Sequence, residues 1–114
     1  MTVERGQIWL ADLGEPDGSE PGYTRPALIV QADAFNRSRL RTVVAVILSS
    51  NLRLVDAPGN VLIPARVSGL RKDSVANVSQ IITVDREFLV ELAGRVRGQV
   101  LHDVEGGLRL VLDL

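Results

Sequence analysis

Apolar residues along the chain gather in short runs that predict β-strands. Residues 42–48, Thr-Val-Val-Ala-Val-Ile-Leu, and residues 26–31 are rich in β-branched side chains and show little alternation with polar ones. This pattern is typical of central strands that are covered on both faces, so these two segments are the predicted core. The other predicted strands are residues 7–13, 60–64 and 74–79, the last running on toward Val84.

Helical spacing is clearest near the end of the chain. The apolar residues that recur there at helical intervals are Val100, Leu101, Val104, Leu108, Val111 and Leu112. They predict an amphipathic helix. Gly106 and Gly107 lie inside it, and each costs roughly 1 kcal/mol relative to alanine. The two glycines therefore suggest either a close approach of another backbone or a kink.

Two shorter helices are also predicted. Residues 33–41 could form a helical turn with Asp33 as its N-cap. Asp85 is a plausible N-cap for a second short helix, because Phe88, Leu89 and Leu92 would then lie on one side.

Long polar connections separate several of these elements. Residues 14–24 contain three glycines and two prolines, which is more than a hairpin connection needs, and residues 49–59 form a second predicted loop. Long loops are often functional. There is no internal repeat or linker, and 114 residues suit one domain. The prediction is therefore a single α+β, mainly β domain over residues 1–114, in which one or two helices pack on a small bent sheet or barrel.

Charge is unevenly distributed along the chain. The net charge is −1, which argues weakly against a nucleic-acid partner. However, residues 25–72 hold eight basic and two acidic residues, a local charge of +6, and such a surface can attract phosphate. Twelve of the thirteen basic residues are arginine, whose planar fork suits phosphate, although a genome rich in G and C gives the same bias.

The composition excludes several classes of site. The chain has no cysteine, so a disulfide, a thiolate nucleophile and a cysteine zinc site are impossible. Its single histidine, His102, cannot form the acid and base pair of a two-histidine nuclease or a paired-histidine metal site. No apolar run is long enough for a bilayer, and Glu4 and Arg5 interrupt any secretory signal, so we expect a cytoplasmic protein with no membrane segment.

The first long loop carries a recognisable motif. It reads Gly18-Ser19-Glu20-Pro21-Gly22-Tyr23-Thr24-Arg25-Pro26 and leads into the apolar residues 27–30. This segment resembles the signature of the MazF/PemK toxins, whose members typically read Gly-Ser-Glu-Gln-x-x-x-Arg-Pro here. The resemblance extends through residues 43–51, where the family has an apolar strand ending in Thr-Ser-Asn, and through residues 71–75 and 80–85. It therefore spans nearly the whole chain.

Two positions depart from the family pattern. Pro21 stands where glutamine is common, which bears on the shape of the loop and on base preference. Ser49 stands where threonine is usual, so the hydroxyl is kept but a methyl group that helps fix its rotamer is lost.

The resemblance implies an SH3-like or CcdB-like fold and the activity of an mRNA interferase, an endoribonuclease toxin that cuts single-stranded RNA. Cleavage without a metal or cofactor requires the RNA 2′-hydroxyl to attack the adjacent phosphorus, which builds negative charge on the phosphoryl oxygens. The guanidinium of Arg25 could stabilise this charge, and the hydroxyl of Ser49 could donate to the same oxygens, with Ser50 as the nearby rival. The resemblance also implies that Arg25 moves protons, but a guanidinium pKa above 12 makes it a poor base.

Loops and exposed polar groups are the candidates for reading the RNA bases, because specific readers bind splayed bases of a single strand. These candidate substrate-binding residues are Glu20, Tyr23, Thr24, Ser50, Asn51, Arg53 and Gln80. Three aromatic or amide side chains could instead have a purely structural role. Tyr23 could pack on its own scaffold, Gln80 could satisfy backbone groups, and Trp9 suits the core better than a stacking platform. We assign His102 no catalytic role.

The family forms homodimers, and the resemblance also implies a cognate antitoxin with an acidic, partly disordered segment that blocks the basic groove. The chief alternative is a CcdB-type gyrase-binding toxin without nuclease activity. Such toxins act through a C-terminal Trp-Gly-Ile, whereas this chain ends in Leu112-Asp113-Leu114, which disfavours that alternative. A non-catalytic regulatory module of the same fold is a third hypothesis.

Overall fold

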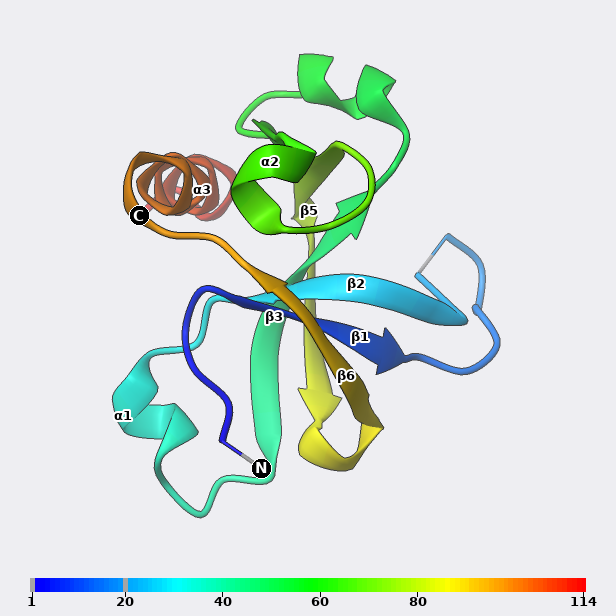
Figure 1. Ribbon diagram of the computed structural model, residues 1–114, viewed down its shortest axis with the longest axis vertical. Helices are drawn as coiled ribbons and strands as arrows, with labels where there is room; N and C mark the ends of the chain where they lie inside the picture. The colour runs from blue at the N-terminus through cyan, green and yellow to red at the C-terminus, as the bar shows by residue number, and fades with distance from the viewer. Residues whose placement is uncertain (1, 20) are drawn as a thin grey trace.

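One strongly curled antiparallel sheet organises the protein, as the computed structural model shows for residues 2–19 and 21–114 (Figure 1). The order of the six strands in that described part is β4-β5-β3-β2-β1-β6. The strands are β1 (Gln7–Asp12), β2 (Thr24–Ile29), β3 (Thr42–Ser49), β4 (Val61–Ile63), β5 (Ser74–Asp85) and β6 (Leu89–Arg95). The helical elements are α1 (Asp33–Asn36), α2 (Ala65–Ser68), α3 (Gly98–Leu112) and the 3₁₀ turns η1 (Leu52–Asp56) and η2 (Arg86–Phe88).

The curl of the sheet depends on an irregularity in β5, the longest described strand. Val46 of β3 pairs with Ile81, whereas Leu48, two residues later, pairs with Ala76. The four residues 77–80 of β5 therefore lie opposite the single residue Ile47 of β3, an excess of three residues on the β5 side. Such a bulge bends a strand and increases its twist. The bend lets β5 serve two parts of the sheet, pairing with β4 at one end and with the start of β3 at the other.

Each face of the curled sheet carries an apolar cluster. Successive side chains of a strand point to opposite faces, and in β3 Val43, Ala45 and Ile47 join one cluster while Val46 and Leu48 join the other. All five side chains are fully buried. The prediction that this run is covered on both faces is confirmed.

The helix α3 covers the second cluster, which lies on the face of Leu28 and Leu48. Val104 is fully buried there, and Val100, Leu101 and Leu108 pack around it. This confirms the predicted C-terminal amphipathic helix. None of the helices in the described residues is long and apolar enough to cross a membrane.

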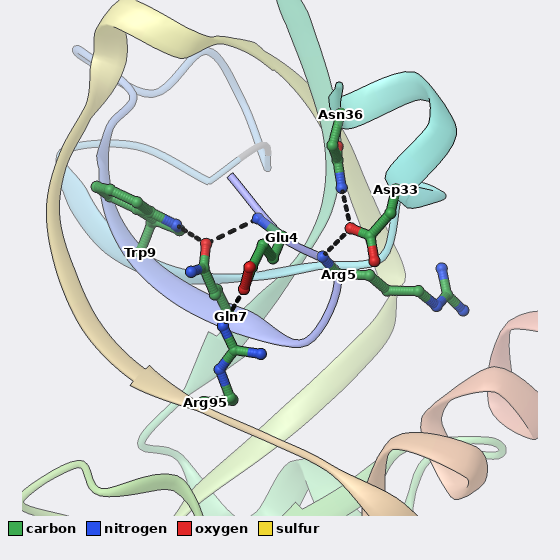
Figure 2. Close-up of polar contacts among 7 residues, drawn as sticks. All are labelled: Glu4, Arg5, Gln7, Trp9, Asp33, Asn36 and Arg95. Carbon is green, nitrogen blue, oxygen red and sulfur yellow. Dashed lines mark hydrogen bonds and ion pairs between the residues drawn. The ribbon is translucent and has the colours of Figure 1, made fainter. Parts of the chain in front are cut away.

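Arg5 ties the N-terminal segment to two distant elements, α1 and α3, and Figure 2 shows its contact with Asp33 of α1. The backbone N–H of Arg5 donates to Asp33 Oδ1 over 2.8 Å, and its guanidinium pairs with Glu105 of α3 over 2.6 Å. Asp33 also accepts a bond from the side chain of Asn36. Both hydrogen bonds favour the charged carboxylate and so hold the pKa of Asp33 below its ordinary value. The bond from the Arg5 backbone has the larger effect. Asp33 is thus the first residue of α1 rather than its N-cap, which is Ala32, so that prediction was wrong.

The predicted helix after Asp85 is also wrong in most of its length. Asp85 does cap a single 3₁₀ turn, accepting a bond from the backbone N–H of Glu87 over 3.0 Å, but the chain then continues as β6. Leu89 is buried opposite Ala11 of β1, while Leu92 is 51% exposed. Pairing with the free edge of β1 satisfies the backbone better than a short helix would. The sequence analysis also missed two short elements: α2, which follows the predicted strand 60–64 in a stretch that was assigned no element, and η1, which lies in the predicted loop 49–59.

The two glycines of α3 differ in their surroundings. A side chain on Gly107 would overlap the backbone carbonyl oxygen of Gly59, whereas a side chain on Gly106 would meet nothing within 4 Å. The expected close approach of another backbone is therefore found at Gly107 and not at Gly106.

This difference predicts opposite effects of two alanine substitutions. Gly107→Ala should lower the free energy of unfolding by about 1–3 kcal/mol, because the helix must move away from Gly59. Gly106→Ala should raise it by up to about 1 kcal/mol, because alanine favours the exposed helix interior. Urea unfolding of both variants, followed by circular dichroism, measures the two changes. Equal effects would show that the close contact at Gly107 does not limit the packing of α3.

Candidate active site

The two candidate catalytic residues lie on adjacent strands. Arg25 is the second residue of β2 and pairs with Ala11, and Ser49 is the last residue of β3 and pairs with Val75. The β2–β3 ladder includes the pair Ala27 and Ile47. Arg25 and Ser49 each lie two residues beyond that pair, toward the same end of the sheet. Because side chains alternate, both belong to the face of Ala27 and Ile47, which is the face opposite α3.

Their burial suits different roles. Arg25 is half-buried, and the Ser49 side chain is buried at the end of its strand, with 9% of the residue exposed. The Ser49 hydroxyl oxygen accepts a bond from the backbone N–H of Asn51 over 3.1 Å, which leaves its proton able to donate. Ser50 is exposed and follows the strand. Arg25 and Ser49 share no direct hydrogen bond in the described part of the chain.

The loop after Ser49 holds three of the candidate substrate-binding residues. Asn51 precedes η1, and its side chain accepts a bond from the backbone N–H of Arg53 over 3.2 Å. Ser50, Asn51 and Arg53 are all exposed. The structure therefore brings these three residues together beside Ser49.

Residues of the first long loop lie at the start of β2. Tyr23 is 66% exposed and has a left-handed backbone with a φ of 59°, a conformation that costs about 1–2 kcal/mol outside glycine. Hydrogen bonds hold it there, because its N–H donates to Gly14 and its carbonyl accepts from Leu13. Its exposed ring is thus free to stack. Thr24 is exposed and pairs with Asp12, whereas Glu20 lies outside the described residues.

A cavity of about 450 Å³ opens at the base of this loop. Its lining residues are Asp12, Leu13, Gly14, Pro21, Ile82, Thr83, Val84, Asp85 and Phe88. The lining thus includes one aromatic residue, Phe88, which is 46% exposed, and two acidic residues, Asp12 and Asp85. Such a space could accept a flat ring that carries amino groups, and it adjoins Arg25 through the paired residues Asp12 and Thr24.

Gln80 lies in the bulge of β5, opposite the part of β3 that contains Ile47, and is half-buried. It therefore sits on the far side of β3 from β2. Trp9 is buried, and its ring N–H donates to Gln7 Oε1 over 2.9 Å, which confirms its assignment to the core (Figure 2). The His102 side chain is exposed on α3. No group of three metal-ligating side chains occurs in residues 2–19 and 21–114.

Sequence reasoning missed Asn60, which fixes the loop that follows Ser49. Its side-chain amide donates to the carbonyl of Leu54 in η1 over 2.9 Å and to Asn77 Oδ1 over 3.2 Å. Its side-chain oxygen accepts a bond from the backbone N–H of Val78 over 3.0 Å. Asn60 thus joins η1 to the bulge of β5 that contains Gln80. The sequence offered no signal, because these partners meet only in the folded chain.

Comparison with known proteins identifies the family of this chain. Residues 4–112 match the model of the PemK-like, MazF-like toxin of type II toxin-antitoxin systems. The chain belongs to this family. It is 46% identical to the endoribonuclease MazF6 of Mycobacterium tuberculosis over 100% of both chains. It is 33% identical to the endoribonuclease EndoA of Bacillus subtilis, over 100% of this chain and 97% of that protein.

A solved structure of a similar protein agrees with the fold. It is a mycobacterial endoribonuclease in complex with its cognate antitoxin, 26% identical, with a TM-score of 0.76 over 99% of this chain and 95% of that one. The predicted α+β, mainly β fold is confirmed. MazF/PemK membership supports a toxin of a toxin–antitoxin system with endoribonuclease activity, and neither the gyrase-binding hypothesis nor the non-catalytic module is favoured.

The role of Asn60 in this MazF/PemK protein can be tested with a matched neighbour. Asn60→Ala should lower the free energy of unfolding by about 1–3 kcal/mol, because the Val78 N–H and the Leu54 carbonyl lose their partner. Asn77→Ala should have a smaller effect, because it removes only side-chain contacts of Asn60 and Ser79. Hydrogen exchange should show faster exchange of the η1 amides in Asn60→Ala alone. Unchanged protection of η1 in that variant would contradict the assignment.

Proposed function

We propose that this chain, folded as one domain over residues 1–114, cuts specific sites in single-stranded RNA in the cytoplasm without a metal ion. The observation that carries the proposal is the position of Arg25 and Ser49 at the same end and on the same face of two neighbouring strands. A cation and an alcohol so arranged suit the charge that develops on a phosphoryl group. Family membership supports the endoribonuclease activity itself.

The reaction needs no nucleophile from the protein. The RNA 2′-oxygen forms a bond to the adjacent phosphorus, the bond from phosphorus to the 5′-oxygen breaks, and the 2′-proton leaves as the 5′-oxygen gains one. The products are a cyclic phosphate and a 5′-hydroxyl end. Arg25 would bind the phosphoryl oxygens through its planar fork, and the Ser49 hydroxyl would donate to one of them.

Base selection would fall to the residues that surround this pair. Tyr23 and Thr24 lie on the side of β2, whereas Ser50, Asn51 and Arg53 lie on the side of β3. Glu20 and Gln80 complete the proposed set. Exposed aromatic and polar side chains on both sides of a phosphate site suit single-stranded RNA, because its bases can be splayed apart and read on their edges.

Exposed apolar residues support a homodimer. They are Leu110, Val111, Leu112 and Leu114 at the end of α3, with Leu52 and Val55 of η1 and Leu62 of β4. Both α3 and η1 contact β4, so these residues belong to one side of the molecule. Apolar patches of this kind mark association surfaces. We propose that a second copy covers this one and that an acidic, partly disordered segment of the antitoxin binds near Arg25.

Arg25→Ala tests the proposed chemistry. Loss of the guanidinium should lower the cleavage rate by about 100- to 1000-fold, because the developing negative charge loses its principal partner. Arg39→Ala, which removes an exposed arginine near α1, should cleave like the parent protein. Counting new 5′-hydroxyl ends in a mixed RNA pool with excess chelator measures both rates. Parent-like cleavage by Arg25→Ala, or cleavage that stops when the chelator is added, would refute the proposal.

The two neighbouring serines can be separated by the same assay. Ser49→Ala should lower the cleavage rate by at least about tenfold, whereas Ser49→Thr should keep most of it because the donor remains. Ser50→Ala should cleave at the parent rate. The reverse pattern, with Ser50→Ala slow and Ser49→Ala fast, would assign the donor to Ser50.

A further inference from the structure

A second cleft, of about 390 Å³, lies at the far end of β1 from Arg25. It is lined by Arg66, Val67, Ser68, Gly69, Arg95 and Arg97. Three arginines therefore line it from two stretches of chain: α2 with the residue after it, and the end of β6 with the start of the segment that leads to α3. None of these residues belongs to the proposed active site.

The convergence depends on a close backbone contact. Gly94 of β6 lies against the carbonyl oxygen of Ser68, and a side chain on Gly94 would overlap that oxygen. The end of α2 can therefore pack directly on β6. This contact holds Arg66 and Arg95, far apart in the sequence, around one cleft.

The cleft carries an excess of positive charge. Arg95 pairs with Glu4 over 2.6 Å (Figure 2), but Arg66 and Arg97 are exposed and bond to no side chain of the described residues. Among residues 2–19 and 21–114, no carboxyl-bearing residue lines the cleft. Arg97 also occupies the N-cap position of α3, whose first turn has neither a side-chain cap nor an acidic residue, so the positive end of that helix dipole adds to the charge.

We propose that this cleft binds a backbone phosphate of the RNA substrate, outside the site of cleavage. This inference rests on the proposed function. Arg95 pairs with Gln7 and Arg25 pairs with Ala11, so four residues of β1, about 13 Å, separate the two positions along the strand. The cleft borders α2, whose Val67 packs on the cluster that α3 covers, whereas Arg25 lies on the opposite face, so an RNA chain bound at Arg25 would pass around the edge strand β6 to reach the cleft. The planar guanidinium groups of arginine suit phosphate. A peptide with apolar side chains fits less well, because Val67 is the one apolar side chain that lines the cleft among the described residues.

The test compares RNA binding by a double variant, Arg66→Ala with Arg97→Ala, and by a control, Arg39→Ala with Arg109→Ala. Both pairs are exposed and both changes remove the same net charge. The probes are two RNAs with a 2′-deoxy nucleotide at the mapped cleavage position: a short one that covers only that position and a longer one with flanking nucleotides. Neither probe can be cleaved, so the dissociation constant is measured directly.

For the longer RNA we expect the double variant to bind about tenfold more weakly. We also expect its salt dependence to fall by about 0.7 in slope, since each phosphate contact on a single strand contributes about 0.7 and the cleft binds one phosphate. The short RNA and the control variant should bind like the parent protein. Parent-like binding of the longer RNA, equal losses on both RNAs, or an equal loss in the control would overturn the inference. A loss confined to binding of an acidic antitoxin peptide would overturn it as well.

Failure of this inference is distinguishable from failure of the proposed function. If only the inference is wrong, one of these contradicting binding results appears, while the parent protein still cleaves RNA and Arg25→Ala still cleaves about 100- to 1000-fold more slowly. If the proposed function is wrong, the parent protein itself leaves no new 5′-hydroxyl ends.

Discussion

Backbone pairing between β3 and the bent strand β5 holds the remaining structure in place. β3 lies between β2 and β5, and its alternating side chains supply both apolar clusters. Because β5 bends at residues 77–80, the sheet curls enough for its own strands to enclose one cluster, and only the other needs α3 as a cover. The end of β3 that carries Ser49 is therefore fixed by a ladder on one side and by buried side chains on both faces. A phosphate site built there has a rigid floor.

The sequence predicted well those elements whose residue pattern fits only one type of secondary structure. Residues 42–48 form a strand because nearly every side chain is β-branched or apolar and buried, and α3 forms because its apolar positions repeat at helical spacing. The segment with Phe88, Leu89 and Leu92 fits both a helix and an edge strand. Only the free edge of β1, which lies elsewhere in the sequence, decides between them.

The sequence predicted the candidate catalytic residues but not the residues that hold them in place. A family motif and the end of an apolar run pointed to Arg25 and Ser49, and the strand register then gave them a common face. Asn60 could not be found in this way, because its partners Leu54 and Val78 are set by the packing of η1 on the bulge of β5. The arginine cleft depends equally on a contact between Gly94 and Ser68 that no local pattern encodes. The three arginines of this cleft form a basic surface although the net charge of the whole chain is −1.

The contact between Gly59 and Gly107 has a consequence for regulation. The carbonyl of Gly59 rests directly on α3, and the next residue, Asn60, holds the loop that leads from Ser49. The two backbones touch at this point, so a displacement of α3 would move Gly59 with it. The helix is thereby mechanically coupled to the loop that leads from Ser49, and a molecule bound to α3 could shift that loop.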